Sequence, residues 1–187
     1  MIDTLREQAV GGNATVACYY IDFAQEQSPA AILGSVLKQI VGGLNEVPER
    51  IVKAFRDRKK AIGGHRLELT EIVEFLQDIS SSPPTFICID ALDECPPADR
   101  VKLLGSLNQI LQRSPDTRIF LTGRAHIRRE VDRHLAGRVA MRSISPTKDD
   151  IVIFLQAKLK EDTMPEAMDE SLKEEIIKNI PETVSEM

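Results

Sequence analysis

Short apolar runs alternate along the chain with longer stretches of helical periodicity. Runs at 16–23, 86–89 and 118–122 predict strands, and a weaker run at 139–144 predicts a fourth. Between and after them, apolar residues recur three or four positions apart. Strands that alternate with helices are typical of α/β proteins with a parallel sheet covered on both faces. The predicted helices begin near Pro29, Pro48, Leu69, Pro97, Ile127, Lys148 and Leu172.

Local signals add detail to several of these helices. Ser28 is expected to cap the helix that begins at Pro29, and Thr147 with Asp150 has the spacing of a capping box. The helix from Pro48 is expected to turn Ile51, Val52 and Phe55 inward. The last helix is expected to end before Pro181. The segment Met1–Val10 is typical of the end of a helix, stopped by Gly11-Gly12.

Composition narrows the class of protein. The chain has 187 residues, a net charge of -5 and no Trp, so neither a general polyanion binder nor a base-stacking nucleic-acid protein is expected. Cys18, Cys88 and Cys95 lack metal-ligand spacing and are expected to be reduced apolar residues. No apolar run has the length of a membrane span, and the N-terminus is not a signal peptide. We therefore expect a cytoplasmic protein without membrane partners.

Three carboxylates follow the apolar run at 86–89. Asp90, Asp93 and Glu94 come where open α/β sheets bind ligands, beside the carboxyl end of a strand. Close carboxylates repel one another unless a cation, a base or solvent compensates. Magnesium, held by one or two carboxylates together with phosphate oxygens and water, suits this pattern. The alternative is that Asp93 and Glu94 only cap the helix that begins after Pro96.

A second strand brings polar residues to the same edge. Thr122, Gly123 and Arg124 follow the run at 118–122, and right-handed crossovers place both strand ends on one side of the sheet. A carboxylate for a metal ion beside an arginine for a phosphate is the arrangement of a nucleoside-triphosphate site. The alternative for Arg124 is an exposed arginine at a helix start that pairs with the acidic residues.

These segments resemble motifs of a known family. F-I-C-I-D-A-L-D-E-C resembles the Walker B segment of NACHT domains, in the STAND class of P-loop NTPases, and R-I-F-L-T-G-R resembles their sensor 1. Y-Y-I-D-F with the Ser-Pro helix after it is similar to NACHT proteins of fungi, often fused to ankyrin repeats. The resemblance implies a P-loop NTPase-like, three-layer α/β/α fold with a mostly parallel sheet. It also implies Mg²⁺ and ATP or GTP as cofactors.

The same resemblance assigns expected roles to individual residues. Asp90 would hold the magnesium ion, and Asp93 or Glu94 would orient the attacking water. Arg124 would sense the γ-phosphate, and Thr122 beside it is a further expected nucleotide contact. Residues 1–145 would form a partial NACHT core, and residues 146–187 would begin the helical part that follows it.

The sequence departs from the family at the phosphate-binding loop. A P-loop has the pattern G-x-x-x-x-G-K-[ST], and the ten glycines of this chain include no Gly-Lys pair. In the family the loop would lie just upstream of Met1, so we expect a truncated chain that lacks the central P-loop strand. The strands at 118–122 and 139–144 would then have unpaired edges, or would pair with each other, and the chain would be marginally stable.

Three functions remain as hypotheses from the sequence. The first is a truncated NACHT-type nucleotide-binding module for signalling or non-self recognition, with weak or no nucleotide binding and little hydrolysis. The second is a non-catalytic interaction or scaffold module that associates with itself or with other NACHT proteins. The third is a metal-dependent hydrolase or nuclease that uses Asp90, Asp93 and Glu94 alone, although it lacks the further ligands of such sites.

Overall fold

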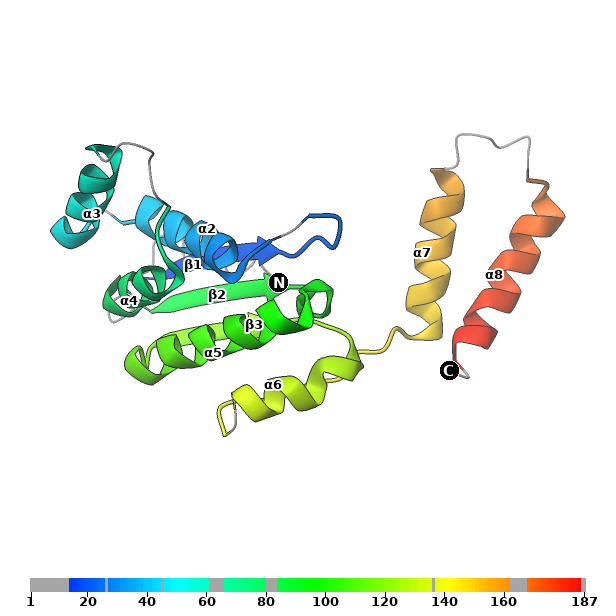
Figure 1. Cartoon of the computed structure of the whole chain (residues 1–187). Helices are drawn as coiled ribbons and strands as arrows, with labels where there is room; N and C mark the ends of the chain where they lie inside the picture. Colours follow the sequence, from blue (N-terminus) through cyan, green and yellow to red (C-terminus); the bar gives the residue numbers. More distant parts are fainter. Residues whose placement is uncertain are drawn as a thin grey trace. The chain divides into compact units, whose positions relative to one another are not determined.

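Three parallel strands form the centre of the first of two structural units, in the order β1-β2-β3 (Figure 1). They are paired in register, so that Cys18 lies beside Cys88 and Cys88 lies beside Phe120. The α/β fold with a parallel sheet, predicted from the alternating pattern, is confirmed. The strands are β1 (Thr15–Tyr20), β2 (Thr85–Asp90) and β3 (Thr117–Leu121).

The computed structural model describes residues 14–25, 27–44, 46–60, 66–79, 84–135, 137–161 and 168–185. The chain divides into one unit that ends at Val139 and a second that begins at Ala140. The helix end predicted for Met1–Val10 lies outside the described residues.

Helices connect the strands and pack against one another along one face of the sheet. Both connections step in the same direction along the sheet, and right-handed crossovers then place their helices on the same face. In agreement, α2 contacts β1, α4 and α5, and α5 contacts β3 and α6. The helices of this unit are α2 (Pro29–Gly42), α3 (Glu49–Lys60), α4 (Leu69–Ile79), α5 (Pro97–Arg113) and α6 (Arg128–His134).

The core lies between this helical layer and the sheet. Side chains alternate between the two faces of a strand, and Ala17, Ile87 and Ile89 lie on the fully covered face. On the other face Phe86 and Phe120 stack with their ring centroids 6.4 Å apart, and Phe120 is 36% exposed. The helical residues that are completely buried in the core include Ile32, Leu33, Leu37, Ile40, Leu76, Leu103, Leu104 and Leu107.

The two edges of the sheet differ. At the outer edge of β1, the Cys18 N–H donates to Oε1 of Gln39 (3.0 Å), and Nε2 of Gln39 donates to the Cys18 carbonyl (2.8 Å). A side-chain amide on α2 thus takes the place of a neighbouring strand at this position. At the outer edge of β3, no further strand pairs with it within the described part of the chain.

The prediction of a strand at 139–144 is wrong. Residues 139–147 have no regular secondary structure, and Ile144 is 92% exposed. A strand is stable only when a partner satisfies its backbone and one of its faces is covered, and this short segment with Arg142 and Ser143 lacks such cover. The direct pairing of this segment with 118–122 is accordingly not found.

Two details of the predicted helices are also wrong. Of the three apolar residues in α3, Ile51 is buried, whereas Val52 and Phe55 are 37% and 53% exposed, so no described element covers the whole apolar face of α3. The last helix does not end before Pro181, since α8 (Glu170–Ser185) continues through it. A proline inside a helix removes one backbone donor and crowds the preceding turn, which is why an end was predicted there, but the backbone of α8 stays helical to Ser185.

The second unit contains α7 (Lys148–Lys160) and α8, which pack against each other. The predicted capping box is confirmed, since Thr147 Oγ1 accepts from the Asp150 N–H (3.2 Å) and Asp150 Oδ2 accepts from the Thr147 N–H (2.9 Å). The predicted cap of α2 is confirmed too, by the Ala31 N–H that donates to Ser28 Oγ. Among the described helices, none has the length and apolar character needed to cross a membrane.

The capping box predicts a pH dependence of the start of α7. The hydrogen bond from the Thr147 hydroxyl, followed by the one from its backbone, lowers the pKa of Asp150. A lowered folded-state pKa means that the carboxylate stabilises the cap above its unfolded-state pKa, and that this stability is lost as the pH falls through the folded-state pKa. In an NMR titration we expect Asp150 and the Thr147 amide to titrate together at acid pH. Thr147→Val is expected to raise the pKa of Asp150, and an unchanged value would contradict this account.

All three cysteines are buried thiols, as predicted. Burial, followed by the charge of Asp99, raises the pKa of the Cys95 thiol, which is therefore protonated and unreactive at neutral pH.

Candidate functional site at the carboxyl ends of β2 and β3

The chain turns sharply where β2 ends at Asp90. Ala91 has a left-handed conformation (φ 56°, ψ 44°), which is uncommon for a residue other than glycine. The turn directs the chain into η1 (Leu92–Glu94), and the Leu92 N–H donates to the Thr122 carbonyl (2.9 Å). The segments after β2 and β3 therefore lie against each other, as the sequence predicted for two polar strand ends.

Thr122 connects the end of β3 to Asp90. Its hydroxyl donates a hydrogen bond to Oδ1 of Asp90 and accepts one from the Ala91 N–H (3.0 Å). The hydroxyl thus fixes the orientation of the Asp90 carboxylate at the edge of the sheet. Oδ2 of Asp90 accepts no hydrogen bond from the described residues, and a carboxylate oxygen is a suitable ligand for Mg²⁺.

Asp93 holds the segment after β3 in place. Its side chain is only 9% exposed, with Oδ1 accepting from the Arg124 N–H (3.1 Å) and Oδ2 lying 3.4 Å from Arg124 Nε. The Arg124 side chain itself is 80% exposed, so water screens this ion pair and it contributes little stability. Asp93 and Glu94 do not cap α5, which begins at Pro97 with Pro96 as its N-cap residue and without a side-chain cap. Arg124 does lie exposed at a helix start and paired with an acidic residue.

Gly123 allows the close approach between these segments. A Cβ atom at this position would lie 2.7 Å from Ile127 Cδ1, closer than real Cβ atoms come, and 3.3 Å from Asp93 Oδ1, which is a tight contact. The sequence indicated Gly123 only as part of a polar strand end. Its packing role depends on Ile127 and Asp93, which come close only in the folded chain.

Glu94 contacts a third segment, the loop after β1. Its Oε2 accepts a hydrogen bond from the Phe23 N–H (3.2 Å), and Asp22 orders the same loop by accepting from the Ala24 N–H (2.9 Å). Sequence reasoning missed this loop, although an aspartate followed by a turn is a recognisable signal. The Phe23 ring is 81% exposed beside the acidic edge.

Arg100 was also missed from the sequence, where it looks like an ordinary polar residue of α5. It is only 6% exposed, and its guanidinium lies between η1 and α6. It forms an ion pair with Glu130 (Nη2 to Oε2, 2.9 Å) and donates from Nη1 to the Asp93 and Cys95 carbonyls (3.2 and 2.8 Å). Arg100 thus lies beneath the acidic segment and joins it to α6.

The metal-binding chemistry of this edge depends on Asp90. Within the described ranges no three His, Cys, Asp or Glu side chains converge as metal ligands, and Asp93 and Glu94 point to separate partners. A hydrolase that uses the three carboxylates alone therefore has no support here. One carboxylate oxygen is compatible with magnesium, which commonly takes its remaining ligands from phosphate and water.

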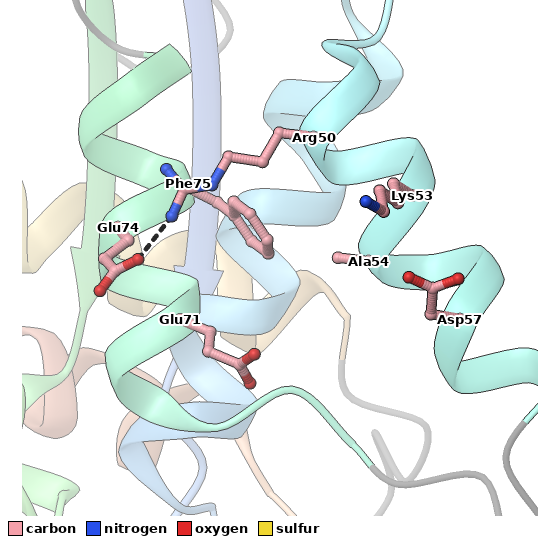
Figure 2. Close-up of a pocket in the computed structure, with 7 residues that line it drawn as sticks. All are labelled: Arg50, Lys53, Ala54, Asp57, Glu71, Glu74 and Phe75. Carbon is pink, nitrogen blue, oxygen red and sulfur yellow. Dashed lines mark hydrogen bonds and ion pairs between the residues drawn. The ribbon is translucent and has the colours of Figure 1, made fainter.

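A hollow of about 260 Å³ lies elsewhere, between α3 and α4. Figure 2 shows Arg50 extending from α3 over the Phe75 ring, 5.4 Å from its centroid, to Glu74 on α4. Lys53 and Asp57 line the same open groove, and none of the sequence-predicted site residues does. Its charges are of both signs and partly neutralise one another, so it does not indicate a ligand.

Comparison with known proteins identifies one family. The family described as nephrocystin 3, N-terminal, matches residues 1–124, which are 124 of the 187 residues. The matched part ends at Arg124 and so includes both polar strand ends. No curated protein matches the chain.

Proposed function

The chain belongs to the nephrocystin 3 N-terminal family, and we propose that its first unit acts as a NACHT-type nucleotide-binding module of a signalling NTPase. Membership of the family alone does not assign nucleotide binding. The proposal depends on the arrangement at the carboxyl ends of β2 and β3. Its substrate class is a nucleoside triphosphate, ATP or GTP, bound with Mg²⁺.

The observation that carries this proposal is the bridge from Thr122 to Asp90 and the Ala91 N–H. It holds Oδ1 of the Asp90 carboxylate at the edge where α/β sheets bind ligands, and no described residue donates a hydrogen bond to Oδ2. Asp90 would hold Mg²⁺, and the exposed guanidinium of Arg124 would contact a phosphate. When bound, the metal ion would neutralise phosphate charge.

The same contacts separate the two carboxylates that were expected to orient water. Both oxygens of Asp93 face Arg124, so this residue positions the segment after β3. Glu94 uses only Oε2, on the Phe23 N–H, and is the better placed general base within this proposal. Because this sequence contains no Gly-Lys pair to supply the P-loop lysine, we expect weak binding and little hydrolysis from this chain.

Thermal melts with and without Mg²⁺ and ATP or GTP test the proposal. A ligand that binds only the folded state at about five times its Kd adds about 1 kcal/mol. For a chain of this length that is a rise in Tm of about 2–4 °C. We expect this rise for the wild type and its loss in Asp90→Asn.

Asp116→Asn is the matched control, since it removes an exposed carboxylate at the opposite end of β3 and is expected to keep the rise. No rise in the wild type at millimolar ligand would overturn the proposal.

The second candidate, an interaction module, is favoured by the outer edge of β3, which has no strand partner in the described part. Melts indifferent to nucleotide, together with a mass that increases with protein concentration in sedimentation, would support that candidate.

A further inference from the structure

Arg100 is a buried charge whose three guanidinium nitrogens all donate hydrogen bonds. A guanidinium that is 6% exposed is unfavourable unless its donors are paired. Nε and Nη2 both donate to Oε2 of Glu130, at 3.1 and 2.9 Å, and Nη1 donates to two backbone carbonyls. The contacts therefore point in two directions, one toward α6 and the other toward the acidic segment.

The two carbonyls belong to the residues on either side of Glu94. Nη1 of Arg100 lies 3.2 Å from the Asp93 carbonyl and 2.8 Å from the Cys95 carbonyl. Both are at the end of η1, where carbonyl groups lose their partners within the helix. One nitrogen thus fixes the backbone before and after Glu94, and the Glu94 side chain is left to reach the Phe23 N–H.

Glu130 fixes the other half of the guanidinium. Its Oε2 accepts two donors of Arg100, whereas its Oε1 is buried without a partner. Glu130 therefore keeps its position through Oε2 alone, although its Oε1 lacks a hydrogen bond from the described residues. Glu130 lies on α6, and α6 follows the segment that contains Thr122 and Arg124. Arg100 therefore links the segment after β2 to the one after β3.

We propose that Arg100 is a positioning residue that sets the place of the Glu94 carboxylate through the two flanking carbonyls, with Glu130 as its anchor. That Glu94 orients water rests on the proposed nucleotide function. The effect of Arg100 on the hydrogen bond between Glu94 and the Phe23 N–H does not depend on nucleotide.

The test is an NMR measurement of backbone amides in Arg100→Gln. We expect the Phe23 amide to move from its wild-type position in the same direction as in Glu94→Gln, because both variants weaken the same hydrogen bond. The Ala24 amide, held by Asp22 in the same loop, is expected to stay. Lys102→Gln is the matched control on α5, since Lys102 is exposed and its ion pair in the described part of the chain is with Asp99, and it is expected to leave Phe23 unchanged.

Arg100→Lys and Glu130→Gln test the same proposal if Arg100→Gln does not fold. Lysine keeps the charge but cannot present the forked donors, so we expect a smaller shift of Phe23 in the same direction. Glu130→Gln keeps the shape of the anchor and is expected to move Phe23 as well. A folded Arg100→Gln or Arg100→Lys protein with Phe23 at its wild-type position would overturn the proposal. Nucleotide is absent from this experiment, so failure of the proposed function would show only in the melts.

Discussion

Leu104→Ala is expected to lower the free energy of unfolding by about 2–5 kcal/mol, since a completely buried leucine loses its side chain and leaves a cavity. Leu104 lies on α5, which contacts α2, α4, α6 and β3, so few neighbours are able to move in without disturbing others. Urea unfolding followed by circular dichroism measures the effect as a shift of the midpoint at unchanged slope.

Val101 provides the control on the same helix. It lies three residues before Leu104 and is 41% exposed, so Val101→Ala is expected to change the free energy of unfolding by about 0.5 kcal/mol or less. Equal effects of the two substitutions would show that α5 does not pack by the face described. A loss below about 1 kcal/mol for Leu104→Ala would contradict its position in the core.

Gly123→Ala is expected to destabilise the first unit by about 1–3 kcal/mol, because the added methyl group would overlap Ile127 Cδ1 at 2.7 Å and crowd Asp93. The same substitution should weaken any rise in Tm caused by Mg²⁺ and nucleotide, since it would separate the segments that carry Asp90 and Arg124. Chemical denaturation and the ligand melts measure the two effects independently.

Gly105→Ala is the matched control, with the opposite expected sign. Gly105 lies inside α5 and has nothing within 4 Å of an added Cβ, so alanine is expected to stabilise the helix by about 0.5–1 kcal/mol. If both substitutions destabilised the protein alike, contact at the strand ends would not account for the effect of Gly123→Ala.

Local rules predicted most of the fold. The Ser28 and Thr147 caps depend on side chains within three residues of the groups that they bind, and the structure contains both. The strand at 86–89 is an apolar run between breakers, and the structure contains it as β2. The sequence also predicted cover on both faces of the sheet, whereas the described helices lie along one face and Phe120 on the other is 36% exposed. The failures at 139–144 and Phe55 have one cause in common. A sequence pattern shows an apolar face, but it does not show whether another element covers it.

The candidate site was predictable in its location and less so in its contacts. Parallel topology alone brings Asp90 and Thr122 to one edge, and the structure places them in hydrogen-bond contact. The division of labour between Asp93 and Glu94 depends on which backbone N–H each carboxylate meets, and these belong to Arg124 and Phe23, far away in the sequence. Arg100 gives no local signal, because its acceptors are mostly backbone carbonyls.

Gln39 makes the addition of a further strand less favourable at one edge of the sheet, the outer edge of β1. Its amide already occupies the N–H and the carbonyl of Cys18, so a strand arriving beside β1 would first have to displace two hydrogen bonds. At the outer edge of β3 no strand pairs within the described part of the chain, although the Thr117 N–H already donates to the Ser114 carbonyl (3.1 Å) and the Thr117 carbonyl accepts from Arg118 Nη1 (3.2 Å). We therefore expect an added strand to pair beyond β3, where the occupied groups lie at the first residue of the strand, more readily than beside β1, where Gln39 occupies the middle of the strand.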